Sequence, residues 1–437
     1  MRTFILPGRV CSTQQIKEIA AQAEGEYVIL QLKPEIRWVY RAEERIQQVA
    51  DMTGAVMVYA DRFINGTEPA PVIDYQAGAL RDDFEFGAVL LIRTSALRQA
   101  TQEMDKDYAY AGFYDLRLRL SRIGAIEHVP EFLYYEVEED MRKSGEKLFD
   151  YVNPANRAVQ IEMEQCVTEH LKAIGALISA KKPHVGSDSL CSFPVTASVI
   201  IPCKNRARTI GEAIESALKQ QVREGYSYNV IVVDDNSTDG TREVIQAHAC
   251  EKLIYIAQDE TYHAIGGNWN VAIHDPRCGQ YAIQLDSDDI YSDENTVQKF
   301  IDAFEAGNCG AVVGTYQIIT KNAEGGWDKG MMIDHREWTD ENGMNNALRI
   351  NGLGAPRGFR TSLLREIDFP TTKYGEDYAV MLRISRDYKI GRIYDVLYYC
   401  RRWEGNSDAN CNIEQMNRNN WYKDRVRTWE LMARKKE

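Results

Sequence analysis

Two groups of acidic side chains, each directly after an apolar run, carry the most chemical information in this 437-residue sequence. Asp234 and Asp235 follow the first run, and Asp286 and Asp288 follow the second. Carboxylates at such spacing repel one another, and a bound cation removes that cost. Carboxylate oxygens are hard ligands that suit Mg²⁺ or Mn²⁺. The sequence therefore predicts a divalent cation together with an anionic ligand that the cation carries.

These acidic groups need strands to position them. Short β-branched runs that end in Asp are typical of buried parallel strands, whose carboxyl ends open onto a crevice where α/β sheets bind ligands. From residue 197 onward strand and helix patterns alternate. We expect strands over residues 198–202 and 230–233, and helices over residues 209–221 and 241–249. This order predicts a parallel sheet with right-handed crossovers.

One domain boundary is visible ahead of this region. An apolar stripe at helical spacing starts at Asn153 and Pro154 and runs to Ile178, and a polar, small-residue segment follows at residues 186–189. The chain is long enough for about two to four domains. We predict a domain over residues 1–150, a connecting helix and linker over 151–194, a second domain over 195–410 and a C-terminal helix over 411–437.

Composition limits the partners and the compartment. The net charge of −13 argues against a protein that binds nucleic acid. The nine cysteines are scattered and never form a C-x-x-C pair, which disfavours structural zinc and disulfides and favours a reducing cytoplasm. No apolar run approaches membrane-spanning length. We expect a cytoplasmic protein; peripheral contact with the inner face of the membrane and homo-oligomer formation stay open.

Five motifs follow one another in the second half of the chain, at residues 200–206, 233–241, 266–270, 286–289 and 375–377. Together they resemble the family 2 glycosyltransferases of GT-A fold, and the resemblance covers roughly residues 196–408. It implies an α/β fold with a Rossmann-like, mixed, mostly parallel sheet flanked by helices. One departure is Trp269, which precedes Asn270 where many relatives have Arg or Lys.

The resemblance implies a site for a nucleotide diphosphate-sugar. Asp234 or Asp235 would accept hydrogen bonds from the base or ribose, although these residue types also form turns and helix caps, and both can hold at once. Asp286 and Asp288 would hold Mn²⁺ or Mg²⁺ beside the diphosphate. The other residues expected at this site are Pro202, Lys204, Asn205, Arg206, Asn270, Ser287, Arg401, Arg402 and Trp403. For Arg401, Arg402 and Trp403 the alternative is surface packing.

Glycosyl transfer with inversion needs a base that takes the proton of the acceptor hydroxyl. Asp377 matches the base position of the family, and Glu376 its common acidic neighbour, which would help to hold the acceptor. The alternative is an acidic pair that only stabilises a helix N-terminus. The implied enzyme is a metal-dependent hexosyltransferase of polysaccharide biosynthesis, with UDP-sugars ranked ahead of GDP-sugars and a saccharide or lipid-linked acceptor.

Other functions stay open. A non-catalytic nucleotide- or sugar-binding scaffold is the main alternative, and a nucleotidyltransferase is a weaker one. The presence of Asp286, Asp288 and Asp377 favours the enzyme. At the C-terminus, residues 420–432 have apolar side chains at helical spacing with basic residues among them. Such a helix packs on its own protein by default, and a membrane surface is the alternative.

The first half of the chain resembles the second. Residues 25–36 align without gaps on residues 279–290, and four further matches follow, namely 54–56 on 310–312, 93–98 on 360–365, 118–122 on 382–386 and 133–135 on 397–399. We predict that residues 1–150 are a truncated, inactive GT-A-like copy, with chance similarity as the alternative. The residues that fall opposite Asp286, Asp288, Glu376 and Asp377 are Leu32, Pro34, Gly112 and Phe113.

Overall fold

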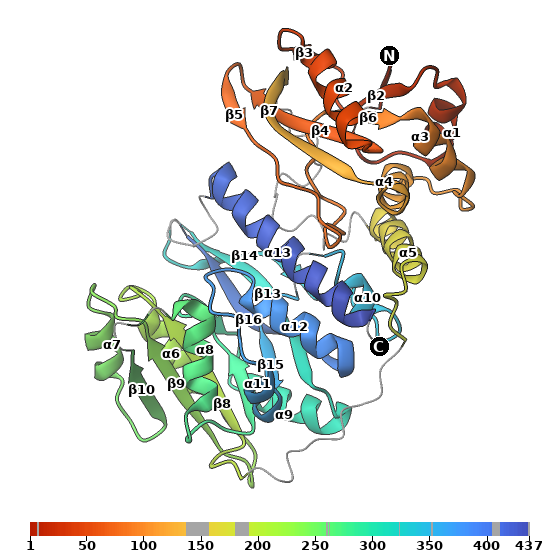
Figure 1. The fold of residues 1–437 in the computed structure, drawn as a ribbon. Coiled ribbons are helices and arrows are strands. Elements are labelled where there is room, and N and C mark those ends of the chain that lie inside the picture. Colours follow the sequence, from red (N-terminus) through yellow and green to blue (C-terminus); the bar gives the residue numbers. More distant parts are fainter. Residues whose placement is uncertain are drawn as a thin grey trace. The chain divides into compact units, whose positions relative to one another are not determined.

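The computed structural model describes residues 1–6, 8–136, 157–179, 192–258, 261, 263–322, 324–350, 353–403 and 411–435. The chain divides into two compact units (Figure 1). The first unit comprises Met1–Ile178, Asn345–Asn351 and Cys411–Glu437, and the second unit comprises Ser179–Met344 and Gly352–Asn410. Each unit is built on one mixed sheet with helices, so the predicted α/β class is confirmed.

The second unit alternates strands and helices as its sequence predicts. Its strands are β8 Ala197–Cys203, β9 Tyr228–Asp234, β10 Leu253–Ala257, β11 Tyr281–Gln284, β12 Ile290–Tyr291, β13 Ala311–Lys321, β14 Trp327–Ile333, β15 Arg357–Arg360 and β16 Ile390–Arg402. Its helices are α6 Ile210–Leu218, α7 Thr241–Ala247, α8 Ala264–His274, α9 Thr296–Gly307, α11 Thr361–Ile367 and α12 Glu376–Asp387. The short helix α10, Gly343–Asn346, begins in this unit and ends in the first.

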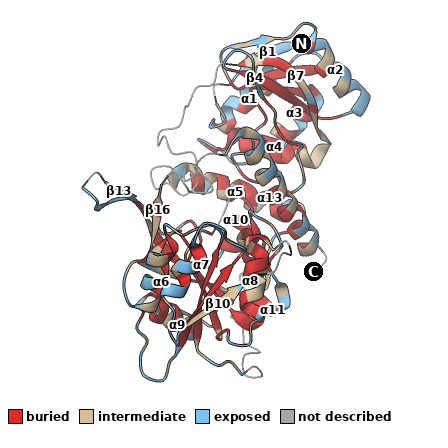
Figure 2. Cartoon of the chain, turned by 90° about the vertical axis from the view of Figure 1, so that its left-hand side faces the viewer, coloured by how far each residue is buried: buried red, intermediate tan, exposed pale blue. Residues whose placement is uncertain are grey.

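The sheet of the second unit has the order β10-β9-β8-β11-β15-β13-β16-β12, with β14 paired to β13. Strands β10, β9, β8 and β11 are parallel to one another, whereas β15 is antiparallel to both β11 and β13. The sheet is therefore mixed, as predicted: it is parallel from β10 to β11, β13 and β16 are also parallel, and β12 is antiparallel to β16. Strands β8, β9 and β11 are buried throughout (Figure 2), which explains their continuous apolar runs.

The first unit has its own sheet. Its strands are β1 Arg2–Ile5, β2 Tyr27–Gln31, β3 Ile36–Trp38, β4 Met57–Ile64, β5 Glu68–Ala70, β6 Val89–Arg93 and β7 Ile126–Glu136. Its helices are α1 Thr13–Gln22, α2 Ala42–Thr53, α3 Thr94–Gln102, α4 Gly112–Ile123, α5 Arg157–Ala173 and α13 Ile413–Arg434. The predicted start of α5 at Asn153 lies outside the described residues. The C-terminal helix α13 lies within the predicted range 411–437 and belongs to this compact unit.

The two sheets share a pattern of strand pairing. The order β1-β2-β6-β4-β7-β3, with β5 on β4, repeats the parallel and antiparallel pairs of β8-β11-β15-β13-β16-β12, with β14 on β13. Tyr27 pairs with Arg93 as Tyr281 pairs with Arg360. Among the strands described in the first unit, none corresponds to β9 or β10.

One part of the predicted alignment between the halves is wrong by two residues. The backbone N–H of Arg93 donates to the carbonyl of Val56, and that of Arg360 donates to the carbonyl of Gly310. Val56, and not Gly54, therefore corresponds to Gly310. The sequence match of residues 54–56 to residues 310–312 is therefore a coincidence of small residues, and strand pairing gives the correct alignment.

Candidate active site

The acidic motifs meet at one edge of the second sheet. Strands β9, β8 and β11 are adjacent and parallel, so their carboxyl ends share an edge. Cys203, the last residue of β8, pairs with Asp234, the last residue of β9. The Asp286–Asp289 loop follows directly after β11, whose backbone is tied to β8 by the N–H of Leu285 donating to Ile200 at 3.1 Å. The sheet therefore brings both acidic groups to the same edge.

Three carboxylates crowd the loop after β11. Burial and the neighbouring carboxylate of Asp288 raise the pKa of Asp286, and burial with both neighbours raises the pKa of Asp289. Asp289 accepts a hydrogen bond from the backbone of Arg401 at 2.7 Å, and the hydroxyl of Tyr398 accepts one from the backbone of Asp286 at 3.0 Å. These hydrogen bonds hold the loop in place although its carboxylates repel one another. A divalent cation bound between the carboxylates would relieve that repulsion.

The loop is not a complete cage of protein ligands. Among the residues that the structure describes, no group of three or more His, Cys, Asp or Glu side chains is arranged to hold a metal ion. Mg²⁺ and Mn²⁺ sites commonly take one or two carboxylates and complete their coordination with water and substrate phosphate. Asp286 and Asp288 fit that kind of site.

A chain of hydrogen bonds joins this loop to the start of α12. Gln284 donates from Nε2 to Oδ1 of Asp286 at 2.9 Å, and Arg357 donates from Nη1 to Oε1 of Gln284 at 2.9 Å. Nη2 of Arg357 lies 2.6 Å from Oδ2 of Asp377. The Arg357 side chain is 6% exposed and that of Asp377 is 31% exposed, so the carboxylate is the accessible end of a buried connection. The D-x-D loop and the predicted base thus lie in one site.

Glu376 lies beside Asp377 and is buried. Burial, followed by the charge of Asp377, raises the pKa of Glu376 to about 8, and Asp286 adds to the effect. At neutral pH this carboxyl is therefore protonated and can donate a hydrogen bond.

The raised pKa of Glu376 predicts a specific dependence of stability on pH. The folded state holds this proton up to about pH 8, whereas an ordinary Glu releases it near 4.5. The stabilisation that the protonated Glu376 side chain gives the folded state is fully present below pH 4.5 and is lost as pH rises through 8. Relative to Glu376→Gln, the native chain should lose about 2–5 kcal/mol between pH 5 and pH 9. Thermal unfolding of both proteins across this range measures the difference, with the exposed Glu44→Gln as control, and parallel curves would contradict it.

The loop after β8 is tied to the loop after β9. Asn205 adopts a φ of 53°, its N–H donates to the hydroxyl of Ser237 at 2.8 Å, and its side-chain carbonyl accepts from the N–H of Thr238 at 2.9 Å. Nε of Arg206 lies 3.9 Å from Oδ2 of Asp288. The first, second and fourth motifs therefore meet, and the backbone of the first is fixed by the second.

Of the two candidate aspartates after β9, one is committed to structure. Asp234 is buried and accepts hydrogen bonds from the N–H of Ser237 and from the hydroxyl of Tyr255, both at 3.0 Å. Asp235 pairs with Nζ of Lys204 at 3.1 Å, and the Lys204 side chain is 58% exposed. The turn interpretation therefore holds for Asp234, and Asp235 with Lys204 is the pair left facing outward.

Two residues predicted to bind the nucleotide-sugar have other roles. The side-chain amide of Asn270 donates to the carbonyl of Phe369 at 2.9 Å and accepts from its N–H at 2.7 Å, so it holds the loop ahead of α12. Arg401 is buried, and its guanidinium donates to the carbonyl of Asp288 and to the carboxylate of Glu212. Neither side chain presents its polar atoms to a ligand, because both are used to position loops of the site.

The remaining predicted residues lie around the same edge. Pro202 is buried within β8, and Ser287 is buried between the two aspartates of the D-x-D. Arg402 and Trp403 are half-buried at the end of β16, and the guanidinium of Arg208 lies 5.1 Å from the Trp403 ring centroid. The segment that follows, residues 404–410, is outside the described residues.

The sequence analysis missed three residues that connect the site, Gln284, Arg357 and Tyr398. Two of them carried a signal. Gln284 is a polar residue inside the apolar run before the D-x-D, and Arg357 is a charged residue inside a short buried strand. A buried polar side chain in a strand needs a partner, and here the two are partners of each other.

The fold and the site together define an α/β domain with a cation-suited acidic loop at its strand ends and a carboxylate connected to it at a helix start. Residues 198–368 match the family model described as "Glycosyl transferase family 2", so this part of the chain is a family 2 glycosyltransferase domain. The match ends before Glu376 and Asp377.

The matching segments cover only a small part of each related protein. Chondroitin synthase of Escherichia coli is 33% identical over 126 residues, which cover 28% of this chain and 17% of that protein. Poly(ribitol-phosphate) beta-N-acetylglucosaminyltransferase TarS of Staphylococcus aureus is 28% identical over 210 residues, which cover 46% of this chain and 35% of that protein. In both cases the chain matches well under half of the relative's length.

Among solved structures, S. aureus TarS 1–349 in complex with UDP-GlcNAc is 21% identical, with a TM-score of 0.41 and coverage of 55% of this chain and 72% of that chain. The mannosyltransferase PcManGT of Pyrobaculum calidifontis, in complex with GDP-Man and Mn²⁺, is 16% identical with a TM-score of 0.37 and coverage of 64% and 84%. Likenesses at this level carry no argument about donor or metal.

Proposed function

We propose that this chain is an inverting, metal-dependent glycosyltransferase that moves a sugar from a nucleotide diphosphate-sugar to a hydroxyl of a saccharide or lipid-linked acceptor. The observation that carries the proposal is the hydrogen-bonded connection from Asp286 through Gln284 and Arg357 to Asp377. A transfer of this kind needs a group that supports the leaving diphosphate and a base for the acceptor at a set distance from each other. One buried arginine and one buried glutamine maintain that distance.

Asp377 is the proposed base. Its Oδ1 accepts the N–H of Tyr378 at 2.6 Å, and its Oδ2 faces Arg357 at 2.6 Å, so the carboxylate plane is fixed before an acceptor arrives. A carboxylate fixed in this way can take the acceptor proton as the oxygen attacks the anomeric carbon. Glu376, protonated beside it, can donate to a second acceptor oxygen. When bound by Asp286 and Asp288, Mn²⁺ or Mg²⁺ would supply positive charge that stabilises the departing diphosphate.

The donor would lie over the loops after β8 and β9. Asp235 has a carboxylate suited to a ribose or base donor, and Arg206, close to Asp288, has a guanidinium suited to phosphate. We rank UDP-sugars ahead of GDP-sugars on the family resemblance. TarS and a second matching protein, Poly(ribitol-phosphate) beta-glucosyltransferase of Bacillus spizizenii, are named for transfer of hexose-type groups, which supports a hexosyltransferase.

We also propose that the sheet of the first unit is a degenerate copy of the catalytic one. The shared pairing pattern supports duplication, and the lack of described counterparts to β9 and β10 supports the loss of a nucleotide site. Gly112 starts α4 as Glu376 starts α12. A Cβ at Gly112 would lie 2.4 Å from the carbonyl oxygen of Ser12, so this position of the copy has no room for a carboxylate.

The proposal predicts metal-dependent binding of one nucleotide. Calorimetry with UDP, GDP, CDP and ADP, each with and without Mn²⁺, should show binding of UDP that requires the metal. Asp286→Asn/Asp288→Asn should weaken it at least about 100-fold, since charge-charge contacts to a cation are lost. Asp302→Asn, an exposed surface change, is the control. Metal-independent binding of every nucleotide would contradict the metal site, and residual metal-dependent binding in the double variant would contradict an inactive first unit. No binding at all would favour a non-catalytic scaffold.

A further inference from the structure

Helix α13 buries several charged residues and exposes several large apolar ones. Asp424 and Arg427 are fully buried, and Lys423, Glu430 and Arg434 are buried as well. On the outside, Trp421 is 40% exposed, Trp429 is 54% exposed and Met432 is 58% exposed. Val426 and Leu431 are buried on the inner side as well, so α13 differs from the usual surface helix in the charged residues that it buries and in the tryptophans that it exposes.

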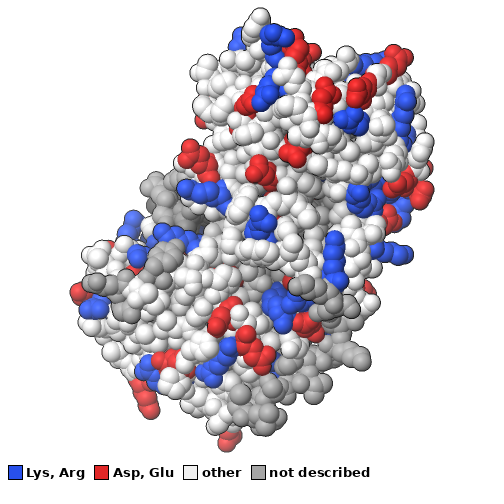
Figure 3. All heavy atoms as spheres, viewed as in Figure 1, with Lys and Arg blue, Asp and Glu red and all other residues white. Residues whose placement is uncertain are grey.

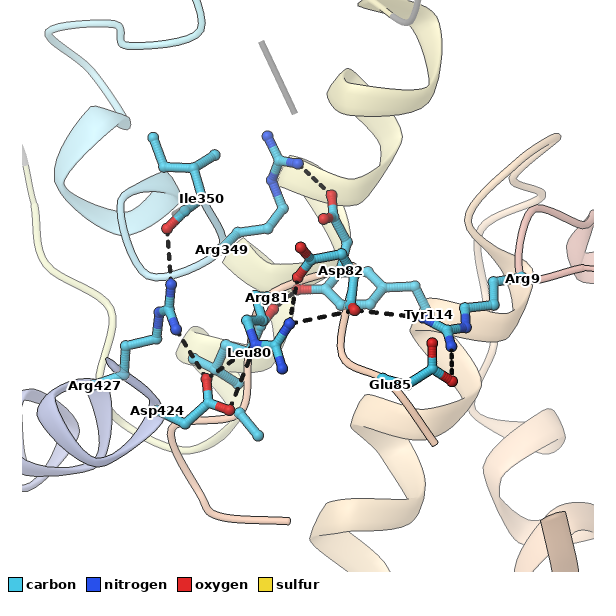
Figure 4. Close-up of polar contacts among 12 residues, drawn as sticks. Arg9, Leu80, Arg81, Asp82, Glu85, Tyr114, Arg349, Ile350, Asp424 and Arg427 are labelled. Atoms are coloured by element: carbon cyan, nitrogen blue, oxygen red, sulfur yellow. Dashed lines mark hydrogen bonds and ion pairs between the residues drawn. The ribbon is translucent and has the colours of Figure 1, made fainter. Parts of the chain in front are cut away.

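The buried side of α13 is fixed by ion pairs within the first unit (Figure 4). Asp424 pairs with Arg427 at 2.8 Å and with Arg81 at 3.3 Å, and Arg427 donates to the carbonyl of Ile350 at 2.9 Å. Turning the helix to bury its tryptophans would keep the Asp424–Arg427 pair but would break the contacts of Asp424 with Arg81 and of Arg427 with Ile350, which is costly for buried charged groups. The aromatic face is therefore kept outward by the fold.

The exposed side of the helix forms one stripe. Arg418, Trp421, Arg425, Trp429 and Met432 are separated by three or four residues and so lie along the same face. The guanidinium of Arg425 lies 5.3 Å from the ring centroid of Trp421. Basic side chains stand among uncharged ones over this part of the first unit in Figure 3. The stripe is thus apolar and basic.

We propose that this face of α13, called here the tryptophan face and made of Arg418, Trp421, Arg425, Trp429, Met432 and Lys435, binds the surface of an anionic lipid bilayer. Tryptophan has an apolar body and a polar N–H and is favoured at the headgroup level, where basic side chains meet lipid phosphates. The overall charge of −13 does not oppose this, because charges beyond about 8 Å are screened at physiological salt.

A second copy of the chain fits this face less well. A two-fold contact would place the same face on both sides of the interface. The basic residues of one copy would then meet those of the other, and like charges across an interface are unfavourable. Charge complementarity therefore favours a negatively charged partner, and the aromatic residues favour one with an apolar interior. The inference goes beyond the proposed transfer reaction and does not depend on it.

Flotation of the full-length chain with vesicles tests the inference. The chain should bind vesicles that contain phosphatidylglycerol, bind phosphatidylcholine vesicles at least tenfold less, and be released by high salt. Arg425→Glu should weaken binding by fivefold or more, which is the factor for about 1 kcal/mol per basic residue. Trp421→Ser/Trp429→Ser should weaken it at least tenfold, and Tyr40→Ser, which changes a 91% exposed aromatic residue elsewhere in the first unit, should not.

Three results would overturn the inference. The first is no binding of the intact chain to anionic vesicles, and the second is equal loss of binding in the Tyr40→Ser control. The third is a concentration-dependent dimer, seen by light scattering, that Trp421→Ser/Trp429→Ser abolishes without any lipid binding, since this would assign the face to a second copy. Circular dichroism and nucleotide binding of each variant, measured separately, distinguish a misfolded variant and a failure of the proposed reaction from a failure of the lipid site.

Discussion

Asp377→Asn should lower kcat by about 10²–10⁴-fold while the affinity for the nucleotide stays within about twofold, because a general base contributes that much to the transition state and does not bind the donor. The amide keeps the shape of the side chain and can still accept from Arg357, which lies 2.6 Å from Oδ2 in the native chain. Steady-state transfer assays measure kcat, and calorimetry measures the affinity.

The matched control for this prediction lies at the other end of the same helix. Asp387 ends α12 and pairs with Arg383 one turn earlier, away from the start of the helix that carries Asp377. Asp387→Asn should leave kcat unchanged. Arg357→Met should lower kcat without changing nucleotide affinity, and Arg357→Lys should recover part of the loss, because Arg357 acts as a positioning residue through Asp377. An Asp377→Asn protein that retains kcat within threefold would contradict the assignment of the base.

Asp424→Ala should lower the free energy of unfolding of the first unit by about 3–5 kcal/mol, the usual cost of removing one partner of a buried ion pair. The side chain of Asp424 is fully buried, and the two arginines that face it, Arg81 and Arg427, are 3% and 0% exposed. Without the carboxylate, Arg427 loses its pair with Asp424, Arg81 keeps its pair with Asp83, and the two buried guanidinium groups repel each other (Figure 4). For a unit of this size the melting temperature should fall by about 6–20 °C.

Differential scanning calorimetry measures this loss, and an exposed ion pair supplies the control. Arg41 and Glu44 lie 3.9 Å apart with side chains 64% and 56% exposed. Glu44→Ala should change stability by less than about 1 kcal/mol, since solvent screens such pairs. If Asp424→Ala melts within 3 °C of the native chain, the buried network does not hold α13 in place, and the argument that its tryptophan face is kept outward fails with it.

The sequence predicted the catalytic sheet because its signals are local. Apolar runs that end in Asp, such as the one before Asp234, correspond to buried parallel strands whose ends share an edge, and Asp286 and Asp288 lie in one loop because both directly follow β11. The start of α12 at Glu376 was equally readable, because acidic residues suit a helix N-terminus. Each of these features depends only on neighbours in the chain.

The roles of polar side chains in the site were harder to predict. Asn270 and Arg401 have side chains that suit a diphosphate, yet the structure uses them on Phe369 and Glu212, which lie 99 and 189 residues away in the chain. A sequence motif shows which polar side chains are present, but it does not show which backbone groups they will contact in the folded protein. Arg357 was passed over for the same reason, since its partners Gln284 and Asp377 come together only in the folded sheet.

The sequence by itself determined the class of the second unit, the two acidic motifs and the start of the catalytic helix, because hydrophobic period, strand ends and helix caps are properties of short stretches. The tertiary structure decided which polar residues face a ligand, which of them tie loops together, and which side of α13 is turned outward. Those outcomes depend on the partner that a charged group meets on burial. The free-energy cost of a buried charge that loses its partner exceeds that of exposing a tryptophan, so ion pairing, together with the burial of Val426 and Leu431, oriented the last helix.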